Sequence, residues 1–230
     1  MGIVADNSSR YACSTFLGSL REEEREELAT LGTTRVFARR TALMLEREAD
    51  DRVMLLLEGR VKATLTGPTG REVLLGIGDP GDVVGEIALI DGAPRSASVT
   101  SLERVKAIVM AGSAFRAHLR QTPRVAFVLL EIVTARFRAA TAERLQFAAS
   151  DTMGRLAARI LELARRYGEE RDGVLTVPLP ISQEELASWA GASRAGAAEA
   201  MRAMRGLGWL ATERGAIVIL QPDALARRCA

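Results

Sequence analysis

The 230-residue sequence has very little histidine and cysteine, which supply many catalytic and metal sites. It holds one histidine, His118, and two cysteines, Cys13 and Cys229, which lie near opposite ends of the chain. These cysteines do not have the spacing of a metal-ligand set, and so few cysteines are typical of the reducing cytosol. No nucleophile–base pair, cluster of metal ligands or P-loop stands out in the sequence. We therefore expect a cytoplasmic protein that is not an enzyme, in which His118 is a surface or packing residue.

Long apolar runs are also missing, although close to half of the residues are hydrophobic. No run approaches the roughly 20 residues that a membrane span needs. The first residues lack the basic and then apolar plan of a secretion signal. Nor is the C-terminal segment strongly basic, since residues 151–230 hold 11 arginines against 10 acidic residues. We expect no membrane partner, and charge alone does not indicate nucleic acid.

The most informative stretch that is present runs from Gly81 to Ser98. Gly85 lets backbone N–H groups approach a phosphate closely, and the Glu86 carboxylate can accept hydrogen bonds from sugar hydroxyls. Nine and ten residues later, Arg95 offers a planar fork for phosphate oxygens and Ser96 offers a hydroxyl. The residue types alone leave two interpretations open. One is a site for a small anionic ligand, and the other is a β-rich segment with a surface arginine and a solvated glutamate.

The spacing of these residues resembles the phosphate-binding cassette of cyclic-nucleotide-binding domains. Gly-Glu-Ile-Ala-Leu, a short turn and then Pro-Arg-Ser-Ala match that motif over residues 85–97. The resemblance implies that Glu86 binds the ribose 2′-hydroxyl, and that Arg95 and Ser96 bind the cyclic phosphate. The predicted ligand-binding residues of the cassette also include Gly85, Ile87 and Ala88.

Short apolar or alternating runs, separated by turn signals, surround the cassette between residues 34 and 110. Strands at this regular spacing suggest a small β sandwich or barrel. The turn around Gly59 resembles the β-roll of cyclic-nucleotide-binding domains. That family usually has a glycine turn near Glu46–Asp51, where this chain has Arg47 and no glycine. Ahead of the strands, residues 14–31 are expected to be helical, with the acidic run 22–27 on a solvated face.

A long helix is predicted to begin at Thr122-Pro123 and to run to about Ala149, because nothing in between breaks it. Its apolar or small positions recur in steps of four and three, a heptad pattern with one polar fault at Arg144. About 27 residues, or about 40 Å, is long for a helix within one globular domain. We favour a dimerisation helix over one packed only on its own β domain. The predicted seam comprises Ala126, Leu130, Val133, Phe137, Ala140 and Phe147.

This helix resembles the long central helix of regulators of the catabolite-activator type. In that family an arginine on the helix lies near the cyclic phosphate, and a Thr-Ser pair further along contacts adenine. The resemblance places Arg136 at the arginine position. The pair here is Ala140-Thr141, so the first hydroxyl is missing and only Thr141 is left to contact a base. Cyclic AMP is the expected effector, and Ala140 leaves room for a different base.

A break is predicted after the long helix, since Asp151 can cap a new one. Beyond it, residues 168–173 read as a polar loop, and residues 174–179 as an edge strand because they end in prolines. The predicted domains are a sensor domain over 1–122, a dimerisation helix over 123–150 and a DNA-binding domain over 151–230.

The DNA-binding domain is predicted from the order of its helix signals. Ser182-Gln-Glu-Glu185 is a capping box before a short helix, Gly191 marks a turn, and Ser193 caps a second helix. This is the helix-turn-helix plan, and Arg214-Gly215 fits the tight turn of a β wing. A generic helical hairpin is the alternative. The stretch from Ser182 to Leu210 resembles the winged helix-turn-helix of the catabolite-activator family.

The second helix of such a motif places its N-terminal residues in the major groove. Arg194 is best placed to read a base, because a guanidinium can bind guanine O6 and N7. The family often has a glutamate after that arginine and a second arginine four residues later, where this chain has Ala195 and Glu199. An acid there opposes phosphate but can accept from cytosine N4, so we expect the usual operator of the family to bind poorly. Phosphate contacts are expected from Gln183, Ser193 and Arg202.

Together these features indicate an α+β protein with an N-terminal cyclic-nucleotide-binding β-roll, a long dimerisation helix and a C-terminal winged helix-turn-helix. The resemblance to the CRP/FNR family implies a homodimeric, cyclic-nucleotide-responsive transcription regulator whose long helix couples the ligand to the recognition helices. Double-stranded DNA, a second copy and RNA polymerase are the expected partners, without metal, haem or iron–sulfur cluster. Two alternatives stay open: a ligand-binding module that regulates a partner protein without touching DNA, and a DNA-binding member with a lost or changed effector.

Overall fold

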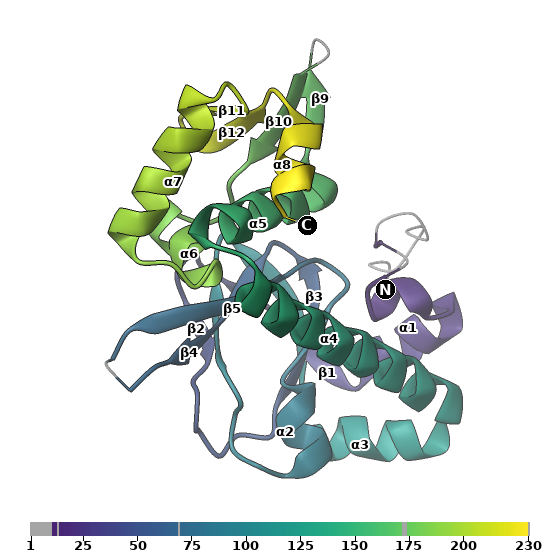
Figure 1. Ribbon diagram of the computed structural model, residues 1–230. Coiled ribbons are helices and arrows are strands. Elements are labelled where there is room, and N and C mark those ends of the chain that lie inside the picture. The colour runs from purple at the N-terminus through teal and green to yellow at the C-terminus, as the bar shows by residue number, and fades with distance from the viewer. Residues whose placement is uncertain (1–10, 13, 69, 172–173, 230) are drawn as a thin grey trace. The chain divides into compact units, whose positions relative to one another are not determined.

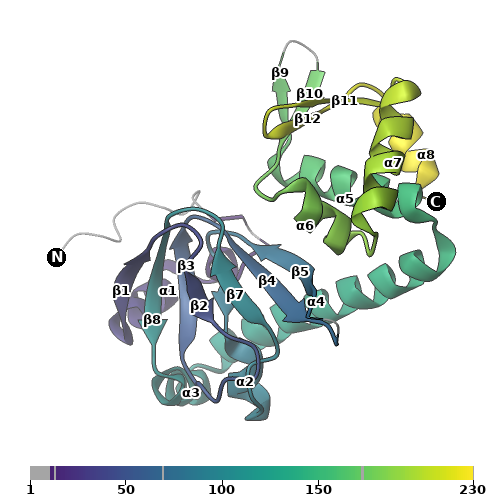
Figure 2. The ribbon, with the colours of Figure 1, turned by 90° about the vertical axis from the view of Figure 1, so that its left-hand side faces the viewer.

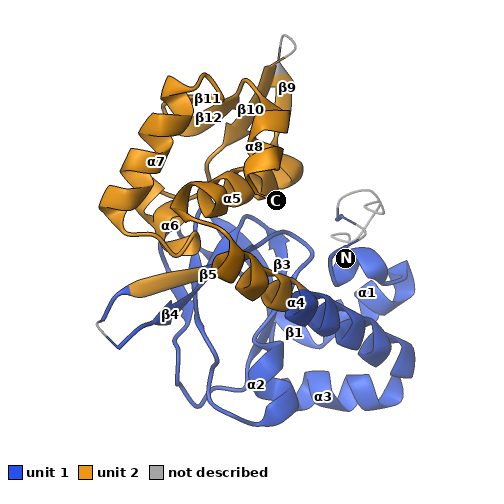
Figure 3. Ribbon diagram, viewed as in Figure 1, with its two compact units in different colours: residues 1–71, 75–138 blue, residues 72–74, 139–230 orange. Residues whose placement is uncertain are grey.

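The computed structural model describes residues 11–12, 14–68, 70–171 and 174–229 (Figure 1). The chain divides into two compact units (Figure 3). The first contains residues 1–71 and 75–138, and the second contains residues 72–74 and 139–230. The division falls within one helix, α4 (Pro123–Ala149), so each half of that helix belongs to a different unit.

Two four-stranded sheets form the β-rich part of the first unit (Figure 2). Their strand orders are β1-β8-β3-β6 and β2-β7-β4-β5. The strands are β1 (Gly32–Phe37), β2 (Ala42–Met44), β3 (Val53–Glu58), β4 (Val61–Thr66), β5 (Glu72–Gly78), β6 (Val83–Val84), β7 (Ser98–Ser101) and β8 (Val105–Met110). The expected series of short strands is therefore confirmed.

Strand β3 is apolar at successive positions because both of its faces are buried. Met54 and Leu56 join a core with side chains of both sheets. Val53 and Leu55 point the other way, into a second core that is shared with helices. Those helices are the 3-10 helix η1 (Leu17–Ser19), α1 (Glu22–Thr30), α2 (Glu86–Asp91), α3 (Gly112–Gln121) and the first half of α4. His118 is buried on α3, in agreement with a packing role.

The N-terminal helix is shorter than predicted, because the chain is extended at Leu20 and Arg21 between η1 and α1. The expectation that all its acids are solvated is wrong for Glu24, which is buried. Glu24 accepts a hydrogen bond from the backbone N–H of Arg21 (2.8 Å) and pairs with Arg124 on α4. Burial raises the pKa of Glu24, but these two partners outweigh it and the pKa is lowered. The glutamate therefore ties α1 to the start of α4.

Helix α4 has the predicted ends, whereas the predicted seam is only partly exposed. Val133 packs on the core of the first unit, and the Phe147 ring lies under the guanidinium of Arg155. These two side chains therefore pack against other residues of the same chain. Large apolar side chains that stay more than half exposed on α4 are Phe127, Leu130, Phe137 and Leu145.

The second unit contains a third four-stranded sheet, with the strand order β11-β12-β10-β9. Asp151 accepts from the backbone N–H of Gly154 (2.9 Å), which confirms the predicted cap. The helices of the second unit are α5 (Thr152–Tyr167), α6 (Gln183–Trp189), α7 (Arg194–Gly206) and α8 (Pro222–Arg228). Its strands are β9 (Glu169–Arg171), β10 (Val174–Pro178), β11 (Leu210–Glu213) and β12 (Ala216–Ile219).

Two expectations for this sheet are wrong. The region predicted as a polar loop contains β9, which pairs with β10. As a result β10 lies between β12 and β9 and is not an edge strand. Pro178 is tolerated because it is the last residue of β10, where a missing N–H does not interrupt the pairing along the strand.

Candidate functional site

The predicted cassette folds around a short helix, α2 (Glu86–Asp91), which the sequence did not predict. Gly85 before it and Gly92 after it have left-handed backbones, with φ of 88° and 71°. Only glycine fits at position 85, because a Cβ there would lie 2.6 Å from the Arg52 carbonyl oxygen and 2.7 Å from Arg95 Nη1. The close approach places the beginning of α2 beside the Arg95 guanidinium.

Arg95 is a buried cation that is paired at both of its terminal nitrogens. Only 3% of the residue is exposed. Nη1 donates to the Gly85 carbonyl oxygen (2.9 Å), and Nη2 donates to the Arg52 carbonyl oxygen and pairs with Asp50 Oδ2 (3.1 Å). Nε is buried and has no hydrogen-bond partner among the residues that the structure describes. An unpaired buried donor costs about 1–3 kcal/mol, so an anionic oxygen at Nε would stabilise this arrangement.

Asp50 is a site residue that the sequence analysis missed. Burial alone would raise the pKa of Asp50, but hydrogen bonds from Arg52 and Arg95 hold it at about 2. Asp50 is therefore ionised near neutral pH and supplies the counter-charge for Arg95. In the sequence Asp50 is one of four acidic residues between positions 46 and 51, and nothing there distinguishes it from the other three.

The loop that carries Asp50 makes its glycine-like turn without glycine. Arg47 has a left-handed backbone with φ of 67°. Its N–H donates to the Arg95 carbonyl oxygen (2.9 Å), and the Arg95 N–H donates to the Glu48 carbonyl oxygen (3.0 Å). The backbone of the cassette is thus fixed to the β2–β3 loop on both sides of Arg95.

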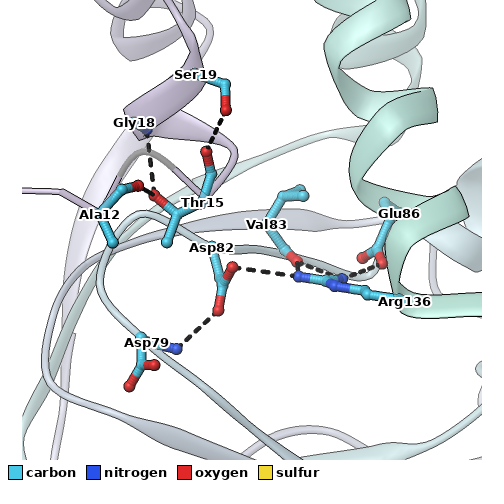
Figure 4. Close-up of polar contacts among 9 residues, drawn as sticks. All are labelled: Ala12, Thr15, Gly18, Ser19, Asp79, Asp82, Val83, Glu86 and Arg136. Carbon is cyan, nitrogen blue, oxygen red and sulfur yellow. Dashed lines mark hydrogen bonds and ion pairs between the residues drawn. The ribbon is translucent and has the colours of Figure 1, made fainter. Parts of the chain in front are cut away.

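Glu86, the first residue of α2, is paired with α4 (Figure 4). Its carboxylate is 3% exposed, and Oε1 accepts from Arg136 Nη1 (2.6 Å). Both terminal nitrogens of Arg136 donate to the Val83 carbonyl oxygen (3.3 Å each), and Nη2 also pairs with Asp82 (3.4 Å). Burial raises the pKa of Glu86, and Arg136 offsets this effect only in part. The carboxylate predicted to bind a ribose is therefore occupied by an arginine.

The remaining predicted ligand residues differ in their exposure to solvent. Ser96 and Ile87 are exposed beside it, whereas Ala88 is buried in α2. Thr141 is exposed on α4, in the half that belongs to the second unit. Asp82, like Asp50, was not predicted, because a lone aspartate in a turn forms no pattern until the fold brings it to Arg136.

A helix-turn-helix is present in the second unit as predicted. Glu185 N–H donates to Ser182 Oγ (3.2 Å), and Ser182 N–H donates to Glu185 Oε2 (2.7 Å), which completes the capping box of α6. Ser193 Oγ accepts from the Gly196 N–H (3.1 Å) and caps α7. Between them Gly191 makes the turn with a left-handed φ of 59°. The cap uses Ser193 as an acceptor and leaves its hydroxyl hydrogen to donate to a phosphate.

The predicted DNA-binding side chains share one property, which is exposure to solvent. Helix α7 buries one face in the domain and presents the opposite face, and β11 and β12 form the predicted wing around Gly215. The exposed residues of the predicted set are Gln183, Ser193, Arg194, Ala195, Glu199 and Arg202. The buried face of α7 contains Ala197, Ala200, Met201 and Met204.

In the part of the chain that the structure describes, no three histidine, cysteine or acidic side chains are grouped so that they could hold a metal ion. None of its helices combines the length and the apolar character that crossing a membrane requires.

Comparison with known families and proteins identifies both units. Residues 34–122 match the cyclic nucleotide-binding domain, and residues 154–228 match the Crp-like helix-turn-helix domain. The CRP-like cAMP-activated global transcriptional regulator of Mycobacterium tuberculosis is 33% identical over 192 residues, which cover 84% of this chain and 86% of that protein. The cyclic AMP receptor protein of Thermus thermophilus is 26% identical and covers 79% of this chain and 81% of its own length.

Solved structures support the same fold at lower identity. A CooA mutant from Carboxydothermus hydrogenoformans aligns with a TM-score of 0.79 at 16% identity, over 96% of this chain and 98% of its own. The c-di-GMP-responsive regulator CLP of Xanthomonas campestris aligns with a TM-score of 0.77 at 20% identity, over 86% and 99%. The two domain matches and the extended likeness to the mycobacterial regulator show that this chain belongs to the CRP/FNR family of DNA-binding transcriptional regulators.

Proposed function

We propose that this regulator acts as a homodimer that binds a cyclic nucleotide, with cyclic AMP as the first candidate, and converts that binding into a change in DNA affinity. Residues 1–122 form the sensor, 123–150 the dimerisation helix and 151–230 the DNA-binding domain. The observation that carries the proposal is the buried Arg95 guanidinium, whose Nε has no partner among the described residues, in the same cassette as the buried Glu86 carboxylate. The names of the mycobacterial and Thermus relatives, which refer to cAMP, support the choice of effector.

In this proposal the effector competes with pairs that already exist in the site. Its phosphate oxygens accept from Arg95 Nε and from the Ser96 hydroxyl. Its ribose hydroxyl donates to Glu86, which Arg136 holds in the free protein. Arg136 then shifts from the carboxylate toward the phosphate, and Thr141 contacts the base. An effector changes DNA affinity only if it binds the two conformations of the protein with different affinity. The Glu86–Arg136 pair stabilises the conformation of the protein without effector.

The exposed apolar side chains of α4 support the homodimer. Phe127, Leu130, Phe137 and Leu145 are each between 57% and 71% exposed on a single helix. Fully burying such a side chain contributes about 1.5–3 kcal/mol. Pairing of two α4 helices would remove this surface from water, with the recognition helix of each chain available for one half of an operator. RNA polymerase is a further partner that we propose from the family.

DNA reading is assigned to the exposed face of α7. Arg194 reads a base, and Gln183, Ser193 and Arg202 contact phosphates. Ala195 and Glu199 are both exposed on the same helix. Because an acid there repels phosphate and accepts from cytosine N4, we propose an operator that differs from the usual one of the family.

Calorimetric titration of the purified protein with cyclic AMP, cyclic GMP and a cyclic dinucleotide tests the site. We expect saturable binding of one of them, one per chain, which is lost in Arg95→Ala and in Glu86→Ala. Arg60→Ala is the matched control, since Arg60 pairs with Asp79 and Glu103 outside the cassette. Thermal unfolding of each variant checks the fold. Absence of heat with all three nucleotides, or wild-type binding by Arg95→Ala, would refute the assignment.

A second candidate is a ligand-binding module that regulates a partner protein and does not bind DNA. Ala195 and Glu199 on the exposed face of α7 favour it, because Ala195 lacks the polar group that the family often has there and Glu199 places an acid where the family often has an arginine. A DNA affinity that falls with the logarithm of salt concentration would exclude this candidate. A DNA-binding member with a changed effector is the third, favoured by Ala140 in place of a hydroxyl.

A further inference from the structure

The helix break between α4 and α5 is cross-linked by a single arginine. Arg155 Nη1 donates to the carbonyl oxygen of Ser150 (2.8 Å), just past the end of α4. Its Nε donates to the carbonyl oxygen of Ala190 (2.9 Å) at the end of α6, and Nη2 lies 3.4 Å from that of Gly191. Carbonyls at helix ends have no partner in their own helix. Arg155 therefore binds the ends of two helices to each other through α5.

A second arginine on α5 makes the same connection through side chains. Arg159 is 8% exposed, and its guanidinium lies 4.7 Å from the ring centre of Trp189 on α6 and 5.9 Å from that of Phe147 on α4. It pairs with Glu143 on α4 and with Glu162 on α5 (2.7 Å). A buried guanidinium with two carboxylates and two ring faces has little freedom to move.

Phe147 also touches the turn of the helix-turn-helix. A Cβ added to Gly191 would lie 3.3 Å from the Phe147 ring, so the ring lies directly against the backbone of the turn. Two residues later Ser193 caps α7. The last turns of α4 therefore contact the segment that sets where the recognition helix begins. All of these residues belong to the second unit, which includes α4 from residue 139 onward (Figure 3).

We infer that Phe147 and Arg159 are positioning residues that transmit the movement of α4 to the recognition helix. The cross-linked break does not bend freely, and the end of α4 and the helix-turn-helix move as one body. This inference rests on the proposed coupling between effector and DNA. It assigns that coupling to a ring and a guanidinium that belong neither to the predicted effector-binding residues nor to the predicted DNA-binding residues.

The test compares DNA affinity with and without saturating cyclic AMP, by fluorescence anisotropy on a duplex enriched from random DNA by the wild-type protein. Allosteric coupling is typically about 5- to 150-fold, and we expect a wild-type ratio in that range. In Phe147→Ala and Arg159→Ala the ratio should fall to within about 2-fold of unity. Calorimetric affinity for cyclic AMP should stay within about 3-fold of wild type, which a merely unfolded variant would not show.

Two variants separate transmission from general damage. Phe147→Tyr keeps the ring and should keep the wild-type ratio. Arg165→Ala removes an exposed arginine from the same helix and should also keep it. A wild-type ratio in Phe147→Ala and Arg159→Ala would overturn the inference. A rise in their effector-free DNA affinity to the effector-bound level would also overturn it, because the cluster would then hold the free protein in its low-affinity conformation. A ratio of unity in the wild-type protein itself would refute the proposed coupling, and this inference with it.

Discussion

Replacing Arg136 by methionine should destabilise the first unit in a way that depends on pH. The substitution keeps an unbranched side chain but removes the cation that faces Glu86 at 2.6 Å. Glu86 is only 3% exposed, so without that cation its charge is buried and uncompensated. Such a carboxyl binds a proton rather than remain ionised.

The cost of that proton sets the upper limit of the effect. Keeping protonated at pH 7 a carboxyl whose ordinary pKa is 4.5 costs about 3.4 kcal/mol, at about 1.36 kcal/mol per pH unit. Burial already raises the pKa of Glu86 in the wild-type protein, so part of this cost is present before the substitution. The Arg136 side chain is 41% exposed, which weakens its other pair with Asp82. We therefore expect a loss of about 1–3 kcal/mol at pH 7.

The sign of the pH dependence follows from the direction of the pKa shift. Because the folded pKa of Glu86 is raised above its unfolded value, stability is highest below pH 4.5 and falls as the pH rises through the folded pKa. Arg136→Met raises the folded pKa of Glu86 further, so the fall in stability continues to higher pH. The two proteins should thus be nearly equal near pH 4.5 and diverge toward pH 7.

Urea denaturation between pH 4.5 and 7.5, followed by circular dichroism, measures this difference. Trp189 and Trp209 both lie in the second unit, so their fluorescence supplies an internal control that should shift much less. The double variant Glu86→Gln, Arg136→Met has no carboxyl at position 86 to protonate, so it should recover most of the lost stability. A loss that is the same at every pH, or no recovery in the double variant, would refute the reasoning.

Four other substitutions have outcomes that denaturation can check. Arg47→Gly should stabilise the first unit by about 1 kcal/mol, since glycine tolerates the left-handed backbone there; a lower melting temperature would count against this. Glu24→Gln should be less stable than wild type above pH 4.5, and the gap should close as the pH falls through the lowered folded pKa of Glu24; a gap that persists in acid would contradict it. Gly191→Ala should cost about 1–2 kcal/mol in the tryptophan transition, because of its left-handed φ and the Phe147 ring at 3.3 Å, and an unchanged midpoint would disprove the contact. Ser182→Ala should cost about 1 kcal/mol by loss of the α6 cap, and an unchanged transition would mean that the cap is not needed.

The features that the sequence predicts correctly are those encoded by neighbouring residues. The strands follow from short apolar runs between turn residues, and α4 begins at Pro123 because proline favours the first helical position. The cassette is recognisable because its glycine, acid and arginine lie within about a dozen residues, a span over which a motif keeps its spacing.

The features that the sequence does not predict depend on partners far along the chain. Glu24 reads as one more solvated acid, and only its pair with Arg124, one hundred residues later, explains its burial. Phe147 fits the heptad of α4, but periodicity on a helix does not say which surface covers a given face. In the fold that face of Phe147 is covered by Arg155 and Arg159 of the same chain.

Helix α2 was missed for a different reason. It has only six residues, and its ends are set by the left-handed backbones of Gly85 and Gly92. Periodicity is not detectable in so short a segment, and glycines beside an apolar run equally suggest a strand between turns.

The most direct test of the central claim is the DNA affinity of the wild-type protein and of Arg95→Ala, titrated with cyclic AMP at one stated salt concentration. The account predicts that wild-type affinity rises by about 5-fold or more and saturates, whereas Arg95→Ala binds the same DNA without responding. Salt-dependent DNA binding that cyclic AMP, cyclic GMP and a cyclic dinucleotide all leave unchanged, or an equal response in Arg95→Ala, would contradict it.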